Sequence, residues 1–256
     1  MTLPDALMQH NRKMIHRRVA GALVIPEQRL RLPVLDRGRS LRILSRRVDR
    51  RYGAVNSPSG PPPPAKKANQ RRSDRIVERA AQWVHDGRRL DMQGLADELG
   101  ISRATLFRNA GGREALLSSA LWVLTERSLE AAIKRWERQR PPGEMHTPGA
   151  GRCLNDIVSK SAALRRLLDD EPALAIRVLT DPRGQIQTGV VKHVAALLRQ
   201  DMDEFGFIPL IEPDALAYAL VRLGESFIYA DVLAARQPDV DTANRLQQAL
   251  VEATRG

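Results

Sequence analysis

The stretch LADELGISRATLFRNAGGREALL, residues 95–117, decides the fold of this chain. Its apolar residues are spaced so that two short helices can bury them together. Gly100 lies between these helices, where a tight turn commonly needs a residue that tolerates positive φ. The apolar positions are Leu95, Leu99, Ile101 and Leu106. The pattern predicts a helix-turn-helix. The spacing of the apolar residues is equally compatible with an ordinary helical hairpin in a protein core, which is the alternative.

The ends of both short helices carry suitable capping residues. Asp91 can cap the first helix and Ser102 the second. The second helix, over about 103–109, would lie in the major groove of DNA, with its N-terminal residues against base edges and phosphates. The following GGREALL begins another helix, with Arg113 placed to hold a phosphate near the helix N-terminus. This context favours a DNA-binding motif over a simple hairpin.

Helical patterns surround the motif on both sides. SDRIVERAAQWVHDG (73–87) has a helical period, with Ser73 as the expected N-cap and Gly87 as the expected end. A long helix is expected over 114–140, and PPGEMHTPGAG (141–151) is expected to break it. Further helices are expected over 152–170, 172–180, 184–206, 213–237 and 239–256. No run alternates as a strand does, so the expected fold class is all-α.

The positive charge is concentrated in the first part of the chain. Residues 1–72 hold 17 of the 41 basic and 4 of the 30 acidic residues, so the remaining 184 residues have a net charge of −2. The segment includes RRVDRR (46–51) and SPSGPPPPAKK (57–67), and we expect a disordered, basic, Pro-rich tail. It is interpreted as a solvated tail or as a stretch upstream of the true start codon. A basic arm that adds non-specific attraction to phosphates is the alternative.

Several function classes lack support in the sequence. The single cysteine, Cys153, excludes a disulfide framework within one chain, and five scattered histidines give no metal-ligand spacing. No run of 18 apolar residues is present, so we expect neither a membrane span nor a membrane partner. The chain lacks G-x-S-x-G, H-E-x-x-H, P-loop and Gly-rich dinucleotide motifs. We therefore expect a cytoplasmic protein that has no enzymatic activity, cofactor or metal.

The body of the chain from about residue 74, and most closely 74–120, resembles TetR-family transcriptional repressors and their N-terminal domain. In this family, a small residue is usually followed by Thr, Leu and Tyr, then by one or two His or Arg residues and a Phe. The sequence then continues as Gly-x-(Lys/Arg)-Glu-x-Leu. The corresponding segment here is ATLFRNAGGREALL (104–117). Phe107 replaces the family's Tyr, which removes a hydroxyl that normally reaches a phosphate and costs about 1 kcal/mol. Ala110 replaces an aromatic residue that packs the reading helix against the next helix.

This resemblance implies roles for residues of the motif. Ser102, Thr105 and Arg113 would position the DNA backbone. Arg103 and Arg108 flank the reading helix, and either could read guanine through two hydrogen bonds worth ~1–3 kcal/mol of discrimination. Contacts of both arginines to phosphate alone are the alternative. The predicted DNA-binding residues are Ser102, Arg103, Ala104, Thr105, Phe107, Arg108 and Arg113.

The segment EPDALAYALVRLGESFIYADVLAARQPDVDTA (212–243) is similar to the last two helices of the QsdR-type branch of the family, which is linked to lactone and quorum-signal degradation. Its helix over 213–237 is apolar on two sides, which suits a place between a core and a partner copy, and a buried core helix is the alternative. Arg222 and Glu225 form either an i, i+3 ion pair or polar contacts in an effector pocket. The predicted ligand-binding residues are Tyr218, Arg222, Glu225, Ser226 and Tyr229.

The sequence thus predicts a tail over 1–72, a helix-turn-helix DNA-binding domain over 73–120, and a helical ligand-binding and dimerisation domain over 121–256. The expected function is a ligand-responsive transcriptional repressor that binds a palindromic double-stranded DNA operator as a homodimer. A small-molecule effector would release it, and the resemblance implies a lactone or other acyl-type molecule. Its expected location is the cytoplasm, at the nucleoid. A helical interaction module with a degenerate helix-turn-helix and an all-helical enzyme are the alternatives.

Overall fold

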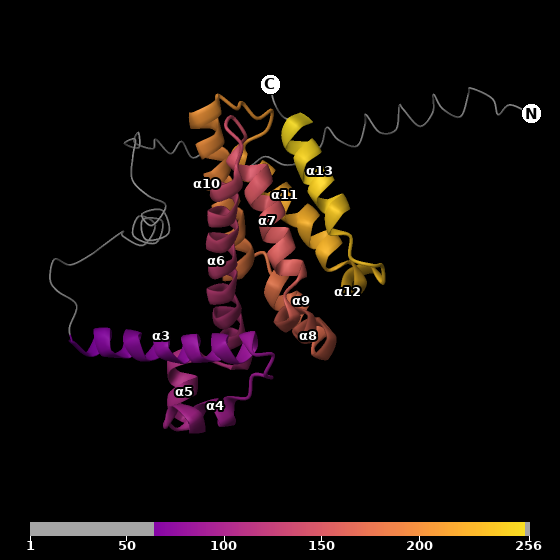
Figure 1. The fold of residues 1–256 in the computed structure, drawn as a ribbon. Helices are drawn as coiled ribbons and strands as arrows, with labels where there is room; N and C mark the ends of the chain where they lie inside the picture. Colours follow the sequence, from indigo (N-terminus) through magenta and orange to yellow (C-terminus); the bar gives the residue numbers. More distant parts are fainter. Residues whose placement is uncertain (1–63, 254–256) are drawn as a thin grey trace, which may run out of the picture. The chain divides into compact units, whose positions relative to one another are not determined.

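The computed structural model describes residues 64–253, and this part of the chain is built from α-helices (Figure 1). It contains no β-strand, which confirms the predicted all-α class for these residues. The predicted tail up to residue 63 lies outside the described residues. The helices are α3 (Pro64–His85), α4 (Met92–Leu99), α5 (Arg103–Ala110), α6 (Arg113–Gln139), α7 (His146–Ser159), α8 (Ala162–Asp170), α9 (Pro172–Thr180), α10 (Gln185–Phe205), α11 (Pro213–Ile228), α12 (Ala230–Ala234) and α13 (Val240–Ala253).

Helix α3 begins at Pro64, so the predicted helix start at Ser73 is wrong. Ser73 lies inside the helix, where its hydroxyl donates to the backbone carbonyl of Asn109 at 2.9 Å. The apolar period begins only at Ile76 because the turn before it is largely exposed to solvent. An exposed helical turn carries no apolar pattern from which its existence could be predicted.

Three other predicted boundaries are also wrong. Helix α7 begins at His146, inside the segment expected to be a linker, and Pro148 is tolerated in its first turn because no intrahelical N–H bond is needed there. The helix expected over 152–170 is interrupted, because Ser161 accepts a hydrogen bond from the Leu164 N–H at 3.2 Å and caps a new helix. The long helix expected from residue 213 is interrupted at Tyr229.

Helices α3, α4 and α5 form a compact head at one end of α6. Figure 1 shows α3 running across the beginning of α6, with α4 and α5 on the side of α3 away from the other helices. Ile76, Leu95, Leu106 and Leu116 are buried in one core that joins the four helices. Ala110 packs against the same core, so the reading helix α5 stays anchored without the family's aromatic residue.

The remaining helices pack into a bundle in which α6 contacts α7 and α10, and α11 contacts α13. Two glycines allow tryptophans of α6 to approach neighbouring helices closely. A Cβ atom on Gly149 of α7 would lie 2.0 Å from Trp136, and one on Gly189 of α10 would lie 2.0 Å from Trp122. No described helix is long and apolar enough to cross a membrane.

We predict that Gly149→Ala destabilises the protein by about 1–3 kcal/mol, because the new methyl group must displace the Trp136 ring. Gly151→Ala on the same helix is the matched control, since a Cβ atom there meets nothing within 4 Å. That control should be neutral or stabilising by about 0.5–1 kcal/mol through helix propensity. Urea unfolding measures both changes, and equal effects of the two substitutions would contradict the proposed close packing.

Candidate DNA-binding head and ligand cavity

The turn of the helix-turn-helix has the predicted caps. The Asp91 carboxylate accepts a hydrogen bond from the Gly94 N–H at 2.6 Å at the start of α4. The hydroxyl of Ser102 accepts one from the Thr105 N–H at 3.1 Å at the start of α5. Gly100 ends α4 with φ of 65°, a conformation that favours glycine. These three local predictions are confirmed, and together they fix the angle between the two helices.

Helix α5 leaves its N-terminal turn and outer side open to solvent, and we call this surface the reading face. The Thr105 hydroxyl accepts hydrogen bonds from Ser102 at 2.9 Å and from Arg108 at 3.3 Å, so these side chains form one exposed polar chain. Phe107 is 62% exposed, a large value for an apolar side chain. The reading face consists of Ser102, Arg103, Ala104, Thr105, Phe107 and Arg108.

The seventh predicted DNA-binding residue, Arg113, is held by other parts of the chain. Its guanidinium donates two hydrogen bonds to the Glu171 carboxylate, at 2.7 and 2.5 Å, and one to the Leu90 carbonyl at 2.6 Å. Arg89 lies 3.4 Å from the same carboxylate. The hydrogen bond from Arg113 holds the pKa of Glu171 below its ordinary value. Arg113 therefore ties the start of α6 to the loop before α4 and to the junction of α8 and α9.

A hollow of about 570 Å³ lies beside the reading face. Arg89, Arg103 and Arg113 line it together with Phe107 and Gly112. Gly112 precedes α6 without a side-chain cap, so the first N–H groups of that helix have no capping acceptor. Arginine and a helix N-terminus both favour oxygen anions. The chemistry of the hollow thus suits a phosphate of the DNA backbone.

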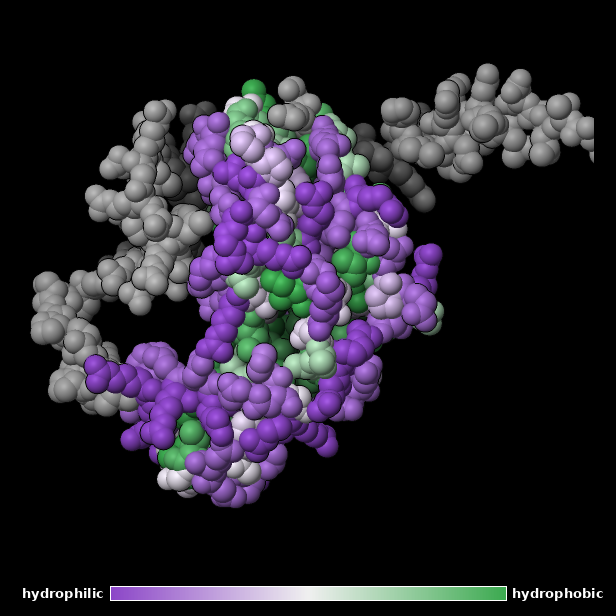
Figure 2. Space-filling model, viewed as in Figure 1, coloured by the Kyte–Doolittle hydropathy of each residue, from purple (hydrophilic) through white to green (hydrophobic). Residues whose placement is uncertain are grey.

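A second and more enclosed site is a cavity of about 600 Å³ inside the bundle. Its walls come from α6 to α11, with further residues from α3 and α13, and most of them are apolar. Figure 2 shows apolar side chains in a hollow on this face, between α6 and the helices α7 to α9. The apolar lining includes Leu121, Leu124, Ile133, Leu154, Ile186 and Ile228. A cavity of this size and composition can enclose a small apolar molecule.

The structure places two of the five predicted ligand-binding residues on the cavity wall. Glu225 and Tyr229 line the cavity, whereas Tyr218, Arg222 and Ser226 do not. Arg222 donates to the Glu225 carboxylate at 2.7 Å, so the ion pair predicted as an alternative is present. Burial raises the pKa of Glu225 to about 7, although Arg222 opposes this shift. Burial also raises the pKa of Tyr229.

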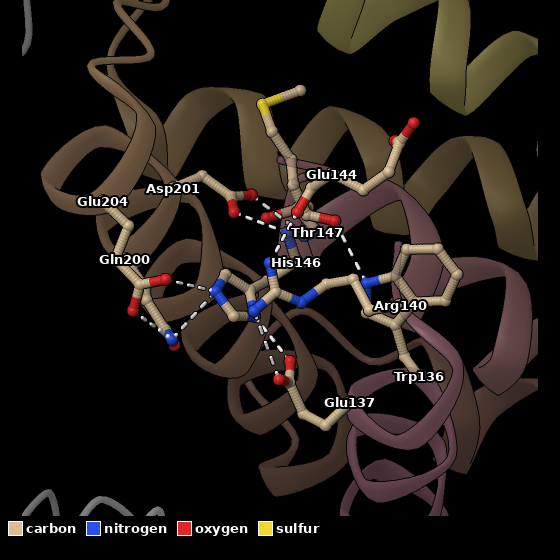
Figure 3. A network of polar contacts seen from close by, with 10 residues as sticks. Trp136, Glu137, Arg140, Glu144, His146, Thr147, Gln200, Asp201 and Glu204 are labelled. Carbon is tan, nitrogen blue, oxygen red and sulfur yellow. Dashed lines mark hydrogen bonds and ion pairs between the residues drawn. The ribbon is translucent and has the colours of Figure 1, made fainter. Parts of the chain in front are cut away.

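A buried histidine begins α7 beside the cavity. The Nδ1 atom of His146 lies 2.6 Å from Glu137 of α6, and its Nε2 atom lies 2.7 Å from Glu204 of α10 (Figure 3). The Asp201 carboxylate accepts hydrogen bonds from the N–H groups of His146 and Thr147 at 2.6 and 2.9 Å. A ring protonated on both nitrogens can donate to both glutamates. The network ties three helices together and fixes the start of α7, which lines the cavity from Thr147 onward.

Comparisons with known proteins agree with this geometry. The family model described as "Tetracyclin repressor-like, C-terminal domain" matches residues 150–252. The solved structure of the transcriptional repressor QsdR from R. erythropolis is similar to 73% of this chain and 97% of its own, with 28% sequence identity and a TM-score of 0.65. The family model and the QsdR structure together support a TetR-family, DNA-binding regulator. The helix-turn-helix of the head is the part of the chain that suits DNA binding.

Two further TetR-family structures are more distantly similar. The repressor AlkX from Dietzia sp. strain DQ12-45-1b is 18% identical, with 77% of this chain and 97% of its own covered and a TM-score of 0.43. The regulator PfmR from Thermus thermophilus is also 18% identical, with 70% and 98% covered and a TM-score of 0.36. None of the curated proteins compared with the chain matches it.

Some site residues could not be predicted from the sequence. Thr147 and Asn155 line the cavity and Glu171 holds Arg113, yet none stands in a recognisable motif. The segment EMHTPGAG was interpreted as part of a linker, which concealed His146 and Thr147. Among the described residues, no group of His, Cys, Asp and Glu is arranged to hold a metal ion.

We predict that His146→Gln lowers the free energy of unfolding by about 1–3 kcal/mol at pH 7, because both donors of an amide are on one nitrogen, whereas the imidazole presents a separate nitrogen to each glutamate. Burial alone raises the pKa of Glu204, but hydrogen bonds from His146 and Gln200 outweigh it and lower that pKa from its ordinary value of 4.5. A lowered carboxyl pKa stabilises the fold above the unfolded value, and this contribution is lost as the pH falls through the folded-state pKa. The deficit of the variant should therefore shrink below pH 4.5.

Urea unfolding at pH 7 and at several pH values below 4.5 measures this effect. His193→Gln on α10 is the control, because the hydrogen bond described for that ring is to the Gly189 carbonyl at 2.9 Å and its ring neighbour is Trp122, so no carboxylate is involved. The control should show a small deficit that does not vary with pH in this way. A His146→Gln deficit of constant size at every pH would show that the ionised glutamates do not depend on the histidine.

Proposed function

We propose that the chain is a transcriptional repressor that binds a palindromic operator as a homodimer and leaves it when a small molecule fills the cavity. The observation that carries this proposal is that α6 belongs to both sites. Its first turn, with Arg113, adjoins the reading face, and its residues from Leu121 to Ile133 line the cavity. A molecule that changes the position of α6 would change the position of the head as well.

The reading face supports the DNA-binding part of the proposal. Arg103 and Arg108 are exposed on either side of the first turns of α5, where neither is committed to an acidic partner among the described residues. Ser102 and Thr105 offer hydroxyl groups beside them, which suits contacts to the DNA backbone. We assign residues 73–120 to the DNA-binding domain and 121–256 to the ligand-binding and dimerisation domain.

The link between Arg113 and Glu171 supports the ligand-responsive part. Glu171 lies between α8 and α9, and both helices contribute cavity walls through Leu164 and Leu179. A ligand that shifts these two helices would move the carboxylate that holds Arg113 and Arg89. Such a change requires that the ligand binds the two arrangements with different affinity. The resemblance to the QsdR-type branch favours a lactone or other acyl-type ligand.

The outer faces of α11 and α13 support the homodimer. Tyr218 is 51% exposed on α11 and Leu246 is 42% exposed on α13, and these two helices pack against each other. Ala215 and Ala249 are exposed on the same two helices and would allow close approach of a second copy. Dimers of helix-turn-helix proteins place two reading helices about 34 Å apart, which matches one turn of DNA. We propose the cytoplasm, at the nucleoid, as the site of action.

We predict that Arg103→Ala with Arg108→Ala abolishes sequence-specific binding, with a loss of about 100-fold or more, since each arginine can supply ~1–3 kcal/mol of discrimination. The measurement first selects DNA from a random-sequence pool at near-physiological salt and then titrates the selected fragment. Arg138→Ala, at the exposed far end of α6, is the matched control and should retain binding. Unchanged specific binding by the double variant would remove the DNA-reading role from these arginines.

We predict that Leu246→Glu converts the dimer to a monomer, because the substitution places a charge on the outer face of α13, which we propose as part of the interface. Sedimentation velocity without DNA measures the change in mass. Phe107→Glu introduces the same kind of charge on an exposed apolar residue of the head and should leave the dimer intact. A wild-type chain that sediments as a monomer at micromolar concentration would contradict the homodimer.

A further inference from the structure

We infer that the cavity takes an uncharged, elongated apolar molecule that carries a hydrogen-bond acceptor, and that Glu225 excludes carboxylate ligands. This inference deepens the proposed function, since it rests on the cavity being the effector site. It concerns the chemical class of the ligand and assigns Glu225 as the residue that selects its charge.

The shape of the cavity favours an elongated molecule. Thr147 and Asn155 both line it from α7, and they are eight residues apart. With a rise of 1.5 Å per residue, they are separated by about 12 Å along the helix axis. The wall between and opposite them is apolar, with Leu154 and Leu197 among its residues. A flexible chain of about this length would replace water along the whole apolar wall.

The charges around the cavity disfavour an anion. His85, Arg127 and Glu225 are the residues of the described lining that can carry a charge, apart from Tyr229. His85 is exposed, and Arg127 is about half exposed and paired with Glu78, whereas the Glu225 side chain is only 14% exposed. A carboxylate ligand would therefore meet a buried carboxyl group and no buried cation. Burying a charge without a partner is strongly unfavourable.

The same arrangement disfavours a cationic ligand. The guanidinium of Arg222 already donates to Glu225 at 2.7 Å, and it would repel an ammonium group placed beside that carboxylate. The groups that neighbour this part of α11 from other helices, Asn155 of α7 and Gln247 of α13, are uncharged. A cationic ligand in the cavity would thus bury a positive charge with no unpaired carboxylate beside it.

Hydrogen-bond donors are available for a neutral acceptor. Burial raises the pKa of Glu225 to about 7, so near neutral pH this carboxyl group can take up a proton and donate a hydrogen bond. Tyr229, a residue only 7% exposed, lines the cavity and carries a hydroxyl group that can donate. The buried Thr147 hydroxyl, in a residue only 5% exposed, has no hydrogen-bond partner among the described residues. An ester, ketone or ether oxygen can accept from such groups.

The test uses four compounds with the same ten-carbon chain: methyl decanoate, decanoate, decylammonium and decane. Each is titrated against the full chain, without DNA, to displace the neutral fluorescent probe N-phenyl-1-naphthylamine at pH 7. Methyl decanoate should bind at least tenfold more tightly than decanoate or decylammonium and more tightly than decane. Tightest binding of decylammonium or of decanoate would overturn the inference.

The role of Glu225 is tested with Glu225→Gln, which should reduce the preference for methyl decanoate over decanoate from at least tenfold to less than threefold. Glu130→Gln is the matched control, since Glu130 is exposed on the outer side of α6 and should leave that preference unchanged. An unchanged preference in Glu225→Gln would show that another group selects the charge. Failure of all four compounds to displace the probe would also overturn the inference. Release of operator DNA by some other small molecule would then leave the proposed function intact.

Discussion

The burial of one side of α6 along its whole length is the constraint on which the rest of the structure depends. The helix has 27 residues, and Leu116, Leu117 and Ala120 are buried against the head, while Ala132 and Trp136 are buried against α7. A helix of this length spans about 40 Å. Because one rigid element contributes to the core beneath the reading helix and to the cavity wall, neither site can change its geometry independently of α6.

Polar contacts fix the two ends of this helix. At its start, Arg113 binds Glu171, which lies 58 residues further along the chain. Near its end, Glu137 contacts His146, whose other ring nitrogen contacts Glu204. Buried or half-buried charged groups of this kind add little net stability, because their desolvation offsets much of their attraction. Their effect is geometric, since each charge is satisfied only when the helices that carry its partners occupy one position.

The comparison of sequence and structure shows which signals are local. The caps at Asp91 and Ser102 and the turn at Gly100 were predicted correctly, because each depends on residues within four positions in the sequence. The start of α3 was predicted incorrectly because residues 69–75 of this helix are mostly exposed and have no apolar pattern. The start of α7 was missed because Pro148 and two glycines suggest a loop, whereas Gly149 is required by the neighbouring Trp136 ring.

The sequence by itself determined the all-helical class, the helix-turn-helix and the exposed arginines of the reading face, since periodicity, capping and charge are properties of neighbouring residues. Only the tertiary structure decided that Arg113 is held by Glu171 and that Glu225 and Tyr229, but not Tyr218 or Ser226, line the cavity. The physical reason is that a cavity wall is made from side chains of many helices. Which side of each helix faces inward depends on how all of them pack, and no single segment carries that information.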